Sequence, residues 1–167
     1  MNPVVTFETS LGSFDVELYA DKAPITVKNF LDYVSAAFYD GTIFHRVIDG
    51  FMIQGGGYGT DERHKPARPP IKNESGNGAR NVRYAIAMAR TEDLDSATSQ
   101  FYINVKDNSF LDDNKYCAFG LVVSGRDVVD KIKAVKVRKP GRLSEAQPVE
   151  QVVIRKGRVK PAAPEAP

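Results

Sequence analysis

Hydrophobic and polar residues alternate with a period of two over much of the chain. The pattern is clearest at residues 12–19, where Phe14, Val16 and Leu18 are separated by acidic residues. Such alternation is typical of a strand with one buried face. Ser10 and Leu11 join this strand to the one before it, and Gly12 can adopt a positive φ. This combination predicts a tight hairpin. Stretches of this kind predict eight strands, at 4–9, 12–19, 43–48, 51–54, 84–89, 100–105, 117–123 and 151–159.

Two stretches follow a helical period instead. Residues 24–34 carry apolar side chains at i, i+3, i+4 and i+7 from Val27, and residues 127–135 form a second apolar face from Val128. Pro24 is acceptable in the first turn of a helix. Eight strands joined by short turns predict a closed barrel, because closure removes exposed sheet edges. The expected fold is therefore mainly β, a closed eight-stranded antiparallel β-barrel capped by two α-helices.

The length of 167 residues fits one domain. We expect residues 1–159 to form it and residues 160–167, which are rich in proline and alanine, to be a flexible tail. Residues 56–83 are rich in glycine, proline and charge and show little periodicity. A connection of that length is usually functional or wraps around the fold.

Composition narrows the setting in which such a domain works. Cys117 is the only cysteine, so an intramolecular disulfide is impossible, and it is expected to be a small buried side chain. No apolar run is long enough to span a membrane. The first residues lack the basic and apolar pattern of a secretory signal, so a cytoplasmic location is expected.

Charge is distributed unevenly. Residues 126–160 contain 11 of the 23 basic residues and four of the 21 acidic ones. A basic segment can contact nucleic acid, but this one contains no aromatic residue on which bases could stack. A solvated basic face is the favoured interpretation, and no specific nucleic-acid partner is expected.

Several catalytic chemistries lack the residues they need. His45, His64 and Cys117 do not have the spacing of a zinc site, and no G-x-S-x-G elbow is present. Residues 55–59 are rich in glycine but fit neither phosphate-binding pattern, which favours a bulge or turn. No metal or other cofactor is expected, and His45 is interpreted as an interior histidine.

Residues 44–56, FHRVIDGFMIQGG, resemble the central signature of the cyclophilin family of peptidyl-prolyl cis/trans isomerases. Residues 28–30, 86–90, 99–103 and 119–120 are similar to further blocks of the family, in the same order. The resemblance covers residues 4–159, and the short form looks like the bacterial cytoplasmic branch. It implies a barrel of eight strands with two capping helices, in agreement with the fold expected from the pattern.

The resemblance also implies a site. Its catalytic residues would be Arg46, Phe51 and Gln54, and its substrate-binding residues would be Met52, Ala89, Arg90, Tyr102, Phe110, Leu111 and Tyr116. Three of these depart from the common family pattern. Tyr102 stands where phenylalanine is usual, Phe110 where many eukaryotic members have tryptophan, and Tyr116 where histidine is common. Each keeps an aromatic ring for a proline pocket, but the hydroxyl of Tyr102 needs a partner.

These residue types suit rotation about a prolyl bond. The barrier of about 18–20 kcal/mol arises because the nitrogen lone pair is delocalised into the carbonyl. A permanently charged guanidinium such as that of Arg46 can donate to the nitrogen once the twisted amide has regained its lone pair. The implied partners are proline-containing peptides and unfolded or partly folded proteins, with weak cyclosporin binding at most. A monomer is expected.

Two other functions stay open at this point. The first is a proline-binding module or holdase with little turnover, although grip on a proline ring alone would not need Arg46. The second is a protein that binds nucleic acid through residues 126–160, for which the absence of aromatic residues predicts only weak, nonspecific binding.

Overall fold

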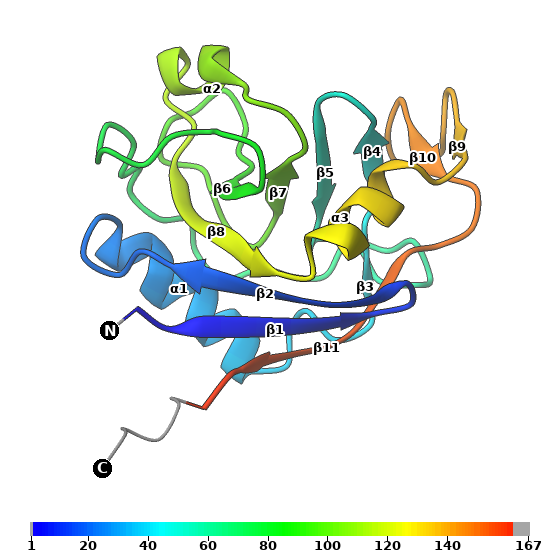
Figure 1. Cartoon of the computed structure of the whole chain (residues 1–167), viewed down its shortest axis with the longest axis horizontal. Coiled ribbons are helices and arrows are strands. Elements are labelled where there is room, and N and C mark those ends of the chain that lie inside the picture. The colour runs from blue at the N-terminus through cyan, green and yellow to red at the C-terminus, as the bar shows by residue number, and fades with distance from the viewer. Residues whose placement is uncertain (1, 162–167) are drawn as a thin grey trace.

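Strands dominate the architecture. The computed structural model describes residues 2–161, and Figure 1 traces the course of the chain through them. Nine strands form one curled sheet in the order β3-β11-β1-β2-β8-β6-β7-β5-β4, with antiparallel neighbours. These strands are β1 (Val4–Thr9), β2 (Gly12–Leu18), β3 (Thr42–Ile43), β4 (Arg46–Ile48), β5 (Met52–Gly55), β6 (Ala85–Met88), β7 (Phe101–Asn104), β8 (Ala118–Ser124) and β11 (Val153–Val159).

The remaining elements are short. β9 (Val137–Arg138) and β10 (Gln147–Pro148) form a separate two-stranded pair. The helices are α1 (Pro24–Ser35), α2 (Ser109–Asp113) and α3 (Arg126–Lys133). The mainly β antiparallel class and the two longer helices confirm the prediction from the sequence. The β9–β10 pair and the single-turn helix α2 were not expected, because segments this short show no readable period.

The predicted closed ring is wrong in one detail. The strand expected at 43–48 is two strands, β3 and β4, which lie at opposite edges of the sheet order and do not pair. Phe44 and His45 join them, and the N–H of Phe44 donates to the carbonyl of Val152 at 3.0 Å. The barrel shape is thus completed by the covalent chain between the two edge strands rather than by a ladder of hydrogen bonds.

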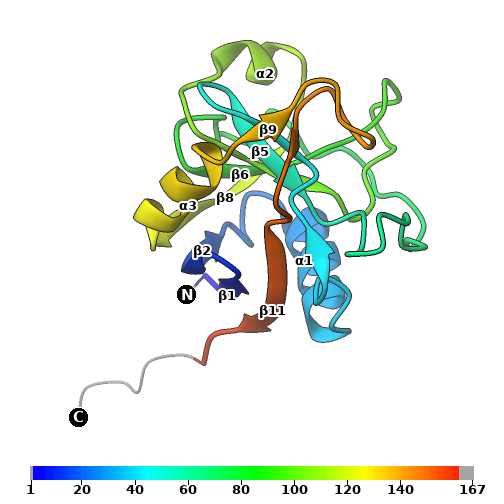
Figure 2. The same cartoon turned by 90° about the vertical axis from the view of Figure 1, so that its right-hand side faces the viewer.

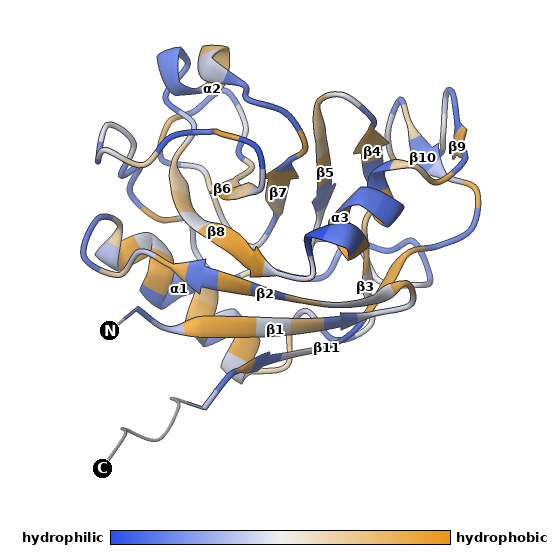
Figure 3. Cartoon of the chain, in the orientation of Figure 1, coloured by the Kyte–Doolittle hydropathy of each residue, from blue (hydrophilic) through white to orange (hydrophobic). Residues whose placement is uncertain are grey.

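The interior of the curled sheet is aromatic. In β2 the alternating residues Phe14, Val16 and Leu18 are buried, as their period predicts. The ring of Phe7 on β1 stacks on that of Phe101 on β7, with centroids 5.6 Å apart. Figure 3 shows hydrophobic residues along β1 and β8, while the turns of α3 that face the viewer are hydrophilic.

Two helices cover this interior. α1 buries Val27 and Phe30, and α3 buries Val128 and Ile132, all within the same hydrophobic cluster. Figure 2 places α1 and α3 on opposite sides of the sheet. Their apolar faces lie where the i, i+3, i+4 spacing predicts, and they cover the sheet as expected for capping helices.

The long connection between β5 and β6 contains no strand or helix, and it contacts the sheet through an isolated bridge from Gly59 to Thr42 and through single hydrogen bonds such as that from the N–H of Ile43 to the carbonyl of Tyr58. It begins at Gly56, which has φ +86° and supports the predicted turn. A Cβ on Gly56 would lie 2.8 Å from the ring of Tyr39 and 2.9 Å from that of Phe101. Close contact with the aromatic core therefore requires glycine here in addition to the positive φ.

The C-terminal end of the domain is fixed by β11. The N–H of Lys160 donates to the carbonyl of Val4 at 2.7 Å, and its ammonium lies 3.0 Å from Asp15. The predicted flexible tail at 160–167 falls largely on residues 162–167, which lie outside the described residues. Among the residues described, none of the helices is both long and apolar enough to cross a bilayer.

Candidate active site

The site is built on the outer face of the sheet by strand register. Arg46 on β4 pairs with Gln54 on β5, which pairs with Tyr102 on β7, which pairs with Ala87 on β6. Because side chains alternate between faces along a strand, directly paired residues lie on the same face. Four strands thus bring a cation, an amide, a phenol and a small apolar residue into one row.

An open pocket lies over this row, with a volume of about 560 Å³. All ten residues that the sequence resemblance implies for the site contact this pocket. Two more, Glu92 and Asn114, also line it and were not predicted, because both lie in loops without a readable pattern. The full lining is Arg46, Phe51, Met52, Gln54, Ala89, Arg90, Glu92, Tyr102, Phe110, Leu111, Asn114 and Tyr116.

The floor of the pocket is apolar and separate from the aromatic interior. Met52, Tyr102 and Leu111 belong to a second hydrophobic cluster, against which Phe51 packs. The ring of Phe110 on α2 is half-exposed and stacks on that of Phe51 with centroids 5.7 Å apart. The short helix α2 therefore supplies one wall of the pocket.

The hydroxyl of Tyr102 finds a buried partner. It donates to Oδ1 of Asn81 at 2.7 Å, and Nδ2 of Asn104 donates to the same oxygen at 3.1 Å. Burial raises the pKa of Tyr102 well above its ordinary value, so the phenol keeps its proton and acts as a donor. The residue that departs from the family pattern is thus anchored beneath the floor. Nothing in its local sequence pattern identifies Asn81 as the acceptor, because it lies 21 positions away.

Asn81 also connects the floor to α2. Its Nδ2 and its N–H both donate to Oδ1 of Asp112 at 2.9 Å. Asn108 extends the network by donating through Nδ2 to Oδ1 of Asn104 at 2.8 Å and to the carbonyl of Phe51 at 2.9 Å. We call Asn81, Tyr102, Asn104, Asn108 and Asp112 the floor network. It holds β5, β7 and α2 in fixed positions around the pocket.

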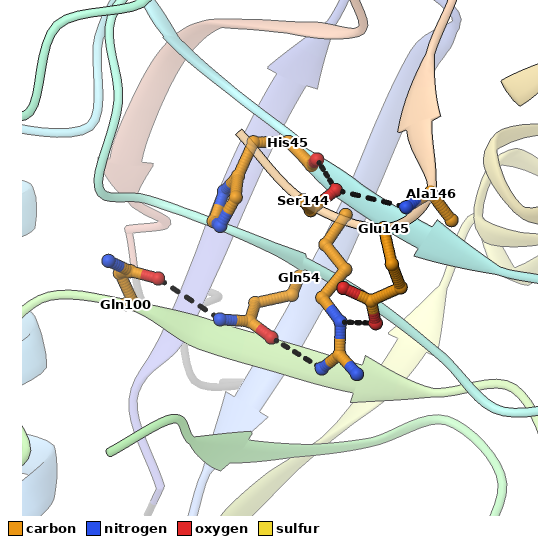
Figure 4. Close-up of polar contacts among 7 residues, drawn as sticks. His45, Gln54, Gln100, Ser144, Glu145 and Ala146 are labelled. Atoms are coloured by element: carbon orange, nitrogen blue, oxygen red, sulfur yellow. Dashed lines mark hydrogen bonds and ion pairs between the residues drawn. The ribbon is translucent and has the colours of Figure 1, made fainter. Parts of the chain in front are cut away.

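Arg46 is oriented by two side-chain acceptors, Gln54 and Glu145, both labelled in Figure 4. Its Nη1 donates to Oε1 of Gln54 at 3.1 Å, and its Nε lies 2.6 Å from Oε1 of Glu145. Gln54 is held in turn, since its Nε2 donates to Oε1 of Gln100 at 3.0 Å. The guanidinium carbon lies 5.8 Å from the ring centre of Phe51. The cation therefore stands at the edge of the apolar floor in a defined orientation.

Arg90 forms another part of the rim. Its Nη1 donates to the carbonyl of Thr91 at 2.8 Å and its Nη2 to that of Asn114 at 2.7 Å. The guanidinium carbon lies 4.4 Å from the ring centre of Tyr116, within cation–π range. Arg90 thus connects two rim loops, whereas the guanidinium of Arg46 is held, among residues 2–161, by side chains alone.

His45 does not line the pocket. It is buried, as predicted, and its ring lies 4.7 Å from that of Tyr58. Burial and the neighbouring charge of Arg46 lower the pKa of His45 to about 4. The imidazole is therefore neutral at pH 7. Cys117 is likewise buried, which agrees with its interpretation as a small hydrophobic residue.

Comparison with known proteins gives the family. Residues 4–159 match the family described as cyclophilin type peptidyl-prolyl cis-trans isomerase. The chain is 50% identical over 159 residues to peptidyl-prolyl cis-trans isomerase A of Dickeya dadantii, covering 93% of this chain and 83% of that protein. It is 51% identical over 158 residues to isomerase B of Escherichia coli, covering 90% and 96%. The chain therefore belongs to the cyclophilin-type peptidyl-prolyl cis–trans isomerases.

A solved structure agrees on the fold. The crystal structure of a Cryptosporidium parvum cyclophilin-type isomerase matches with a TM-score of 0.83 at 23% identity, covering 98% of this chain and 100% of that one. The predicted enzyme class, an isomerase of peptidyl-prolyl bonds, is confirmed by the family membership.

Proposed function

We propose that the pocket binds an X–Pro segment and lowers the barrier to rotation about its peptide bond, with Arg46 as the group that stabilises the twisted amide. The observation that carries this proposal is the position of Arg46. A cation with two side-chain acceptors stands beside an apolar floor large enough for a proline ring. The reaction needs no proton transfer and no covalent intermediate.

The electrostatic contribution follows from the electronic change at nitrogen. In the planar amide the lone pair is delocalised, so a donor gains little from it; in the twisted amide the lone pair is localised and accepts a hydrogen bond. Within residues 2–161 Nη2 of Arg46 donates to no protein group, which leaves it available for this bond. By analogy with an oxyanion-hole donor, it would supply about 3–4 kcal/mol.

Positioning would supply the rest. Shortening a half-time of ~100 s to ~1 ms needs about 7 kcal/mol off the barrier. Anchoring the ring on Phe51, Met52 and Tyr102, which line the pocket, would restrict the proline, and Gln54 would hold a flanking carbonyl. We propose that the other lining residues implied by the resemblance also contact the bound peptide: Ala89, Arg90, Phe110, Leu111 and Tyr116.

A protease-coupled assay of prolyl isomerisation tests the mechanism on the wild type, Arg46→Ala and Arg46→Lys. We expect Arg46→Ala to lose about 10²–10³ in kcat/KM with an unchanged circular dichroism spectrum. Arg46→Lys should also lose most of the activity, because an ammonium has a different donor geometry. A loss below about fivefold for Arg46→Ala would contradict the role of this cation.

The same assay addresses a second candidate, a proline-binding module with little turnover. A wild-type protein that binds proline peptides but does not accelerate their isomerisation would favour that function. Retention of Arg46 in a position that ring binding alone does not require supports the isomerase.

Substrates and setting complete the proposal. We propose proline-containing peptides and unfolded or partly folded proteins as substrates, a monomeric state and a cytoplasmic location. We also propose weak binding of cyclosporin. Acceleration of a proline-limited refolding reaction tests the substrates, sedimentation analysis tests the monomeric state, and cell fractionation tests the location. Inhibition titration tests the binding of cyclosporin.

A further inference from the structure

Arg46 lies on β4, the strand at one edge of the nine-stranded sheet. Residues 144–146, here called the edge segment, run beside it. Ser144 Oγ donates to the carbonyl of the residue before Arg46 at 2.6 Å, and the N–H of the residue after Arg46 donates to the carbonyl of Ala146 at 2.9 Å. Figure 4 shows Glu145 between Ser144 and Ala146. The backbone therefore sets Glu145 directly opposite Arg46.

The resulting contact is short but exposed. Oε1 of Glu145 lies 2.6 Å from Nε of Arg46, while the two side chains are 59% and 30% exposed. The backbone N–H of Glu145 and the charge of Arg46 lower the pKa of this carboxyl, so it is ionised at neutral pH. Glu145 does not line the pocket. It can therefore act on Arg46 without touching a substrate held over the floor.

We propose that Glu145 is a positioning residue for the reaction: it fixes the guanidinium plane of Arg46 from the solvent side while Gln54 fixes it from the sheet side. This inference rests on the proposed role of Arg46. Two acceptors on Nε and Nη1 allow only a narrow range of rotamers. Without Glu145, the long side chain regains rotamers that turn Nη2 away from the prolyl nitrogen.

The solvent exposure of the Arg46–Glu145 ion pair determines whether its loss affects folding stability or turnover. Exposed ion pairs contribute little to folding stability, because water and salt screen them. Orientation of a reacting group, in contrast, affects the transition state strongly even for small displacements. Loss of Glu145 should therefore change turnover and leave stability nearly unchanged.

The experiment compares Glu145→Ala, Glu145→Gln and the matched control Glu150→Ala in the full chain. Glu150 is an exposed glutamate five positions further along the chain, after β10 and outside the pocket. We expect Glu145→Ala to lose about five- to twentyfold in kcat/KM, mostly in kcat with KM little changed. Glu145→Gln keeps an acceptor for Nε and should stay within about threefold of the wild type. The control should match the wild type.

Two further measurements separate positioning from a general effect on structure. In the Arg46→Ala background, Glu145→Ala should cause no further loss, because its target is already absent. In nitrogen-15 spectra, the Nε–H signal of Arg46 should be visible and slow to exchange in the wild type and Glu145→Gln, and should broaden in Glu145→Ala.

Each outcome decides the proposal. Unchanged activity in Glu145→Ala, or equal losses with and without Arg46, would overturn it. A rise in kcat/KM would also overturn it and would mean that Glu145 masks the cation from substrate. If the wild type itself fails to accelerate isomerisation, the proposed function fails, and the Nε–H signal still tests the contact between the two side chains.

Discussion

The two sides of the pocket are held by different kinds of contact. Beneath the floor, Asn81 and Asn104 are buried and bond Tyr102 and α2 through neutral groups and one aspartate. At the rim, Arg46 is held by the exposed Glu145 and by Gln54. Buried polar groups are costly to leave unpaired, whereas exposed ion pairs contribute about 0–1 kcal/mol.

This difference assigns two tasks to two regions. The floor network contributes to both folding stability and the shape of the pocket, so its loss should affect both. The rim contacts orient a charge and can be altered with little cost in stability. Variants on the two sides should therefore separate in a plot of unfolding free energy against kcat/KM.

The largest effect on stability should come from Asn81→Ala. This change removes the acceptor of Tyr102 and Asn104 and leaves buried groups unpaired, so we expect a loss of about 2–4 kcal/mol in urea unfolding. The control is Asn73→Ala. Asn73 is partly exposed and its side chain makes two hydrogen bonds, so its removal should lower the unfolding free energy by under about 1 kcal/mol. Equal losses for the two variants would remove the distinction between the buried floor and the exposed surface.

A pH titration of stability tests the burial of His45, next to Arg46. The pKa of His45 is lowered from 6.5 to about 4 in the folded chain, so between these values the unfolded chain binds a proton that the folded chain does not. The unfolding free energy should fall as the pH is lowered through this window, by at most about 1.4 kcal/mol per pH unit. His45→Gln should flatten this slope, while His64→Gln, an exposed histidine, should keep it.

Phe110→Trp alters the exposed side of the pocket. An indole adds a donor and apolar area at a half-exposed position, so cyclosporin should bind about five- to thirtyfold more tightly, or ~1–2 kcal/mol, with little change in turnover. Inhibition titrations of both forms give the answer. A wild type already inhibited at nanomolar drug, or no gain from tryptophan, would contradict this role of Phe110.

The smallest effect should come from Tyr102→Phe. Asn81 keeps the bond from Asn104 when the hydroxyl is removed, so we expect a loss of about 1 kcal/mol in stability and less than about twofold in kcat/KM. Tyr116→Phe is the matched control for stability, because within residues 2–161 Tyr116 is hydrogen-bonded through its backbone and not through its hydroxyl. Identical stabilities of the two variants would show that the buried bond of Tyr102 contributes nothing.

Periodicity predicts most of the fold. Alternation located the strands to within a few residues, and the helical spacing located α1 and α3. The exceptions have local physical causes. No glycine, proline or other turn residue separates β3 from β4, so the pattern at 43–48 does not reveal that the two parts lie at opposite sheet edges.

The candidate site was accessible from the sequence only in part. Four of the implied pocket residues, Arg46, Met52, Gln54 and Tyr102, lie on β4, β5 and β7, whose pairing brings these strands together. The family motifs in the sequence identify these four and the other implied residues. The residues that hold them are distant in sequence: Asn81 bonds Tyr102 across 21 positions, and Glu145 meets Arg46 across 99. Such partners have no local signal, because their positions depend on the path of the loops.

The pairing of β1 with β11 has a consequence for synthesis of the protein. Val5 lies opposite Val159, so the first strand made is completed by the last. During translation the N-terminal strand and the aromatic interior behind it must wait, unpaired along one edge, until the whole domain has left the ribosome. Long-range pairing of this kind slows folding and exposes intermediates to association. We therefore expect this isomerase domain to complete its sheet only after β11 has been made.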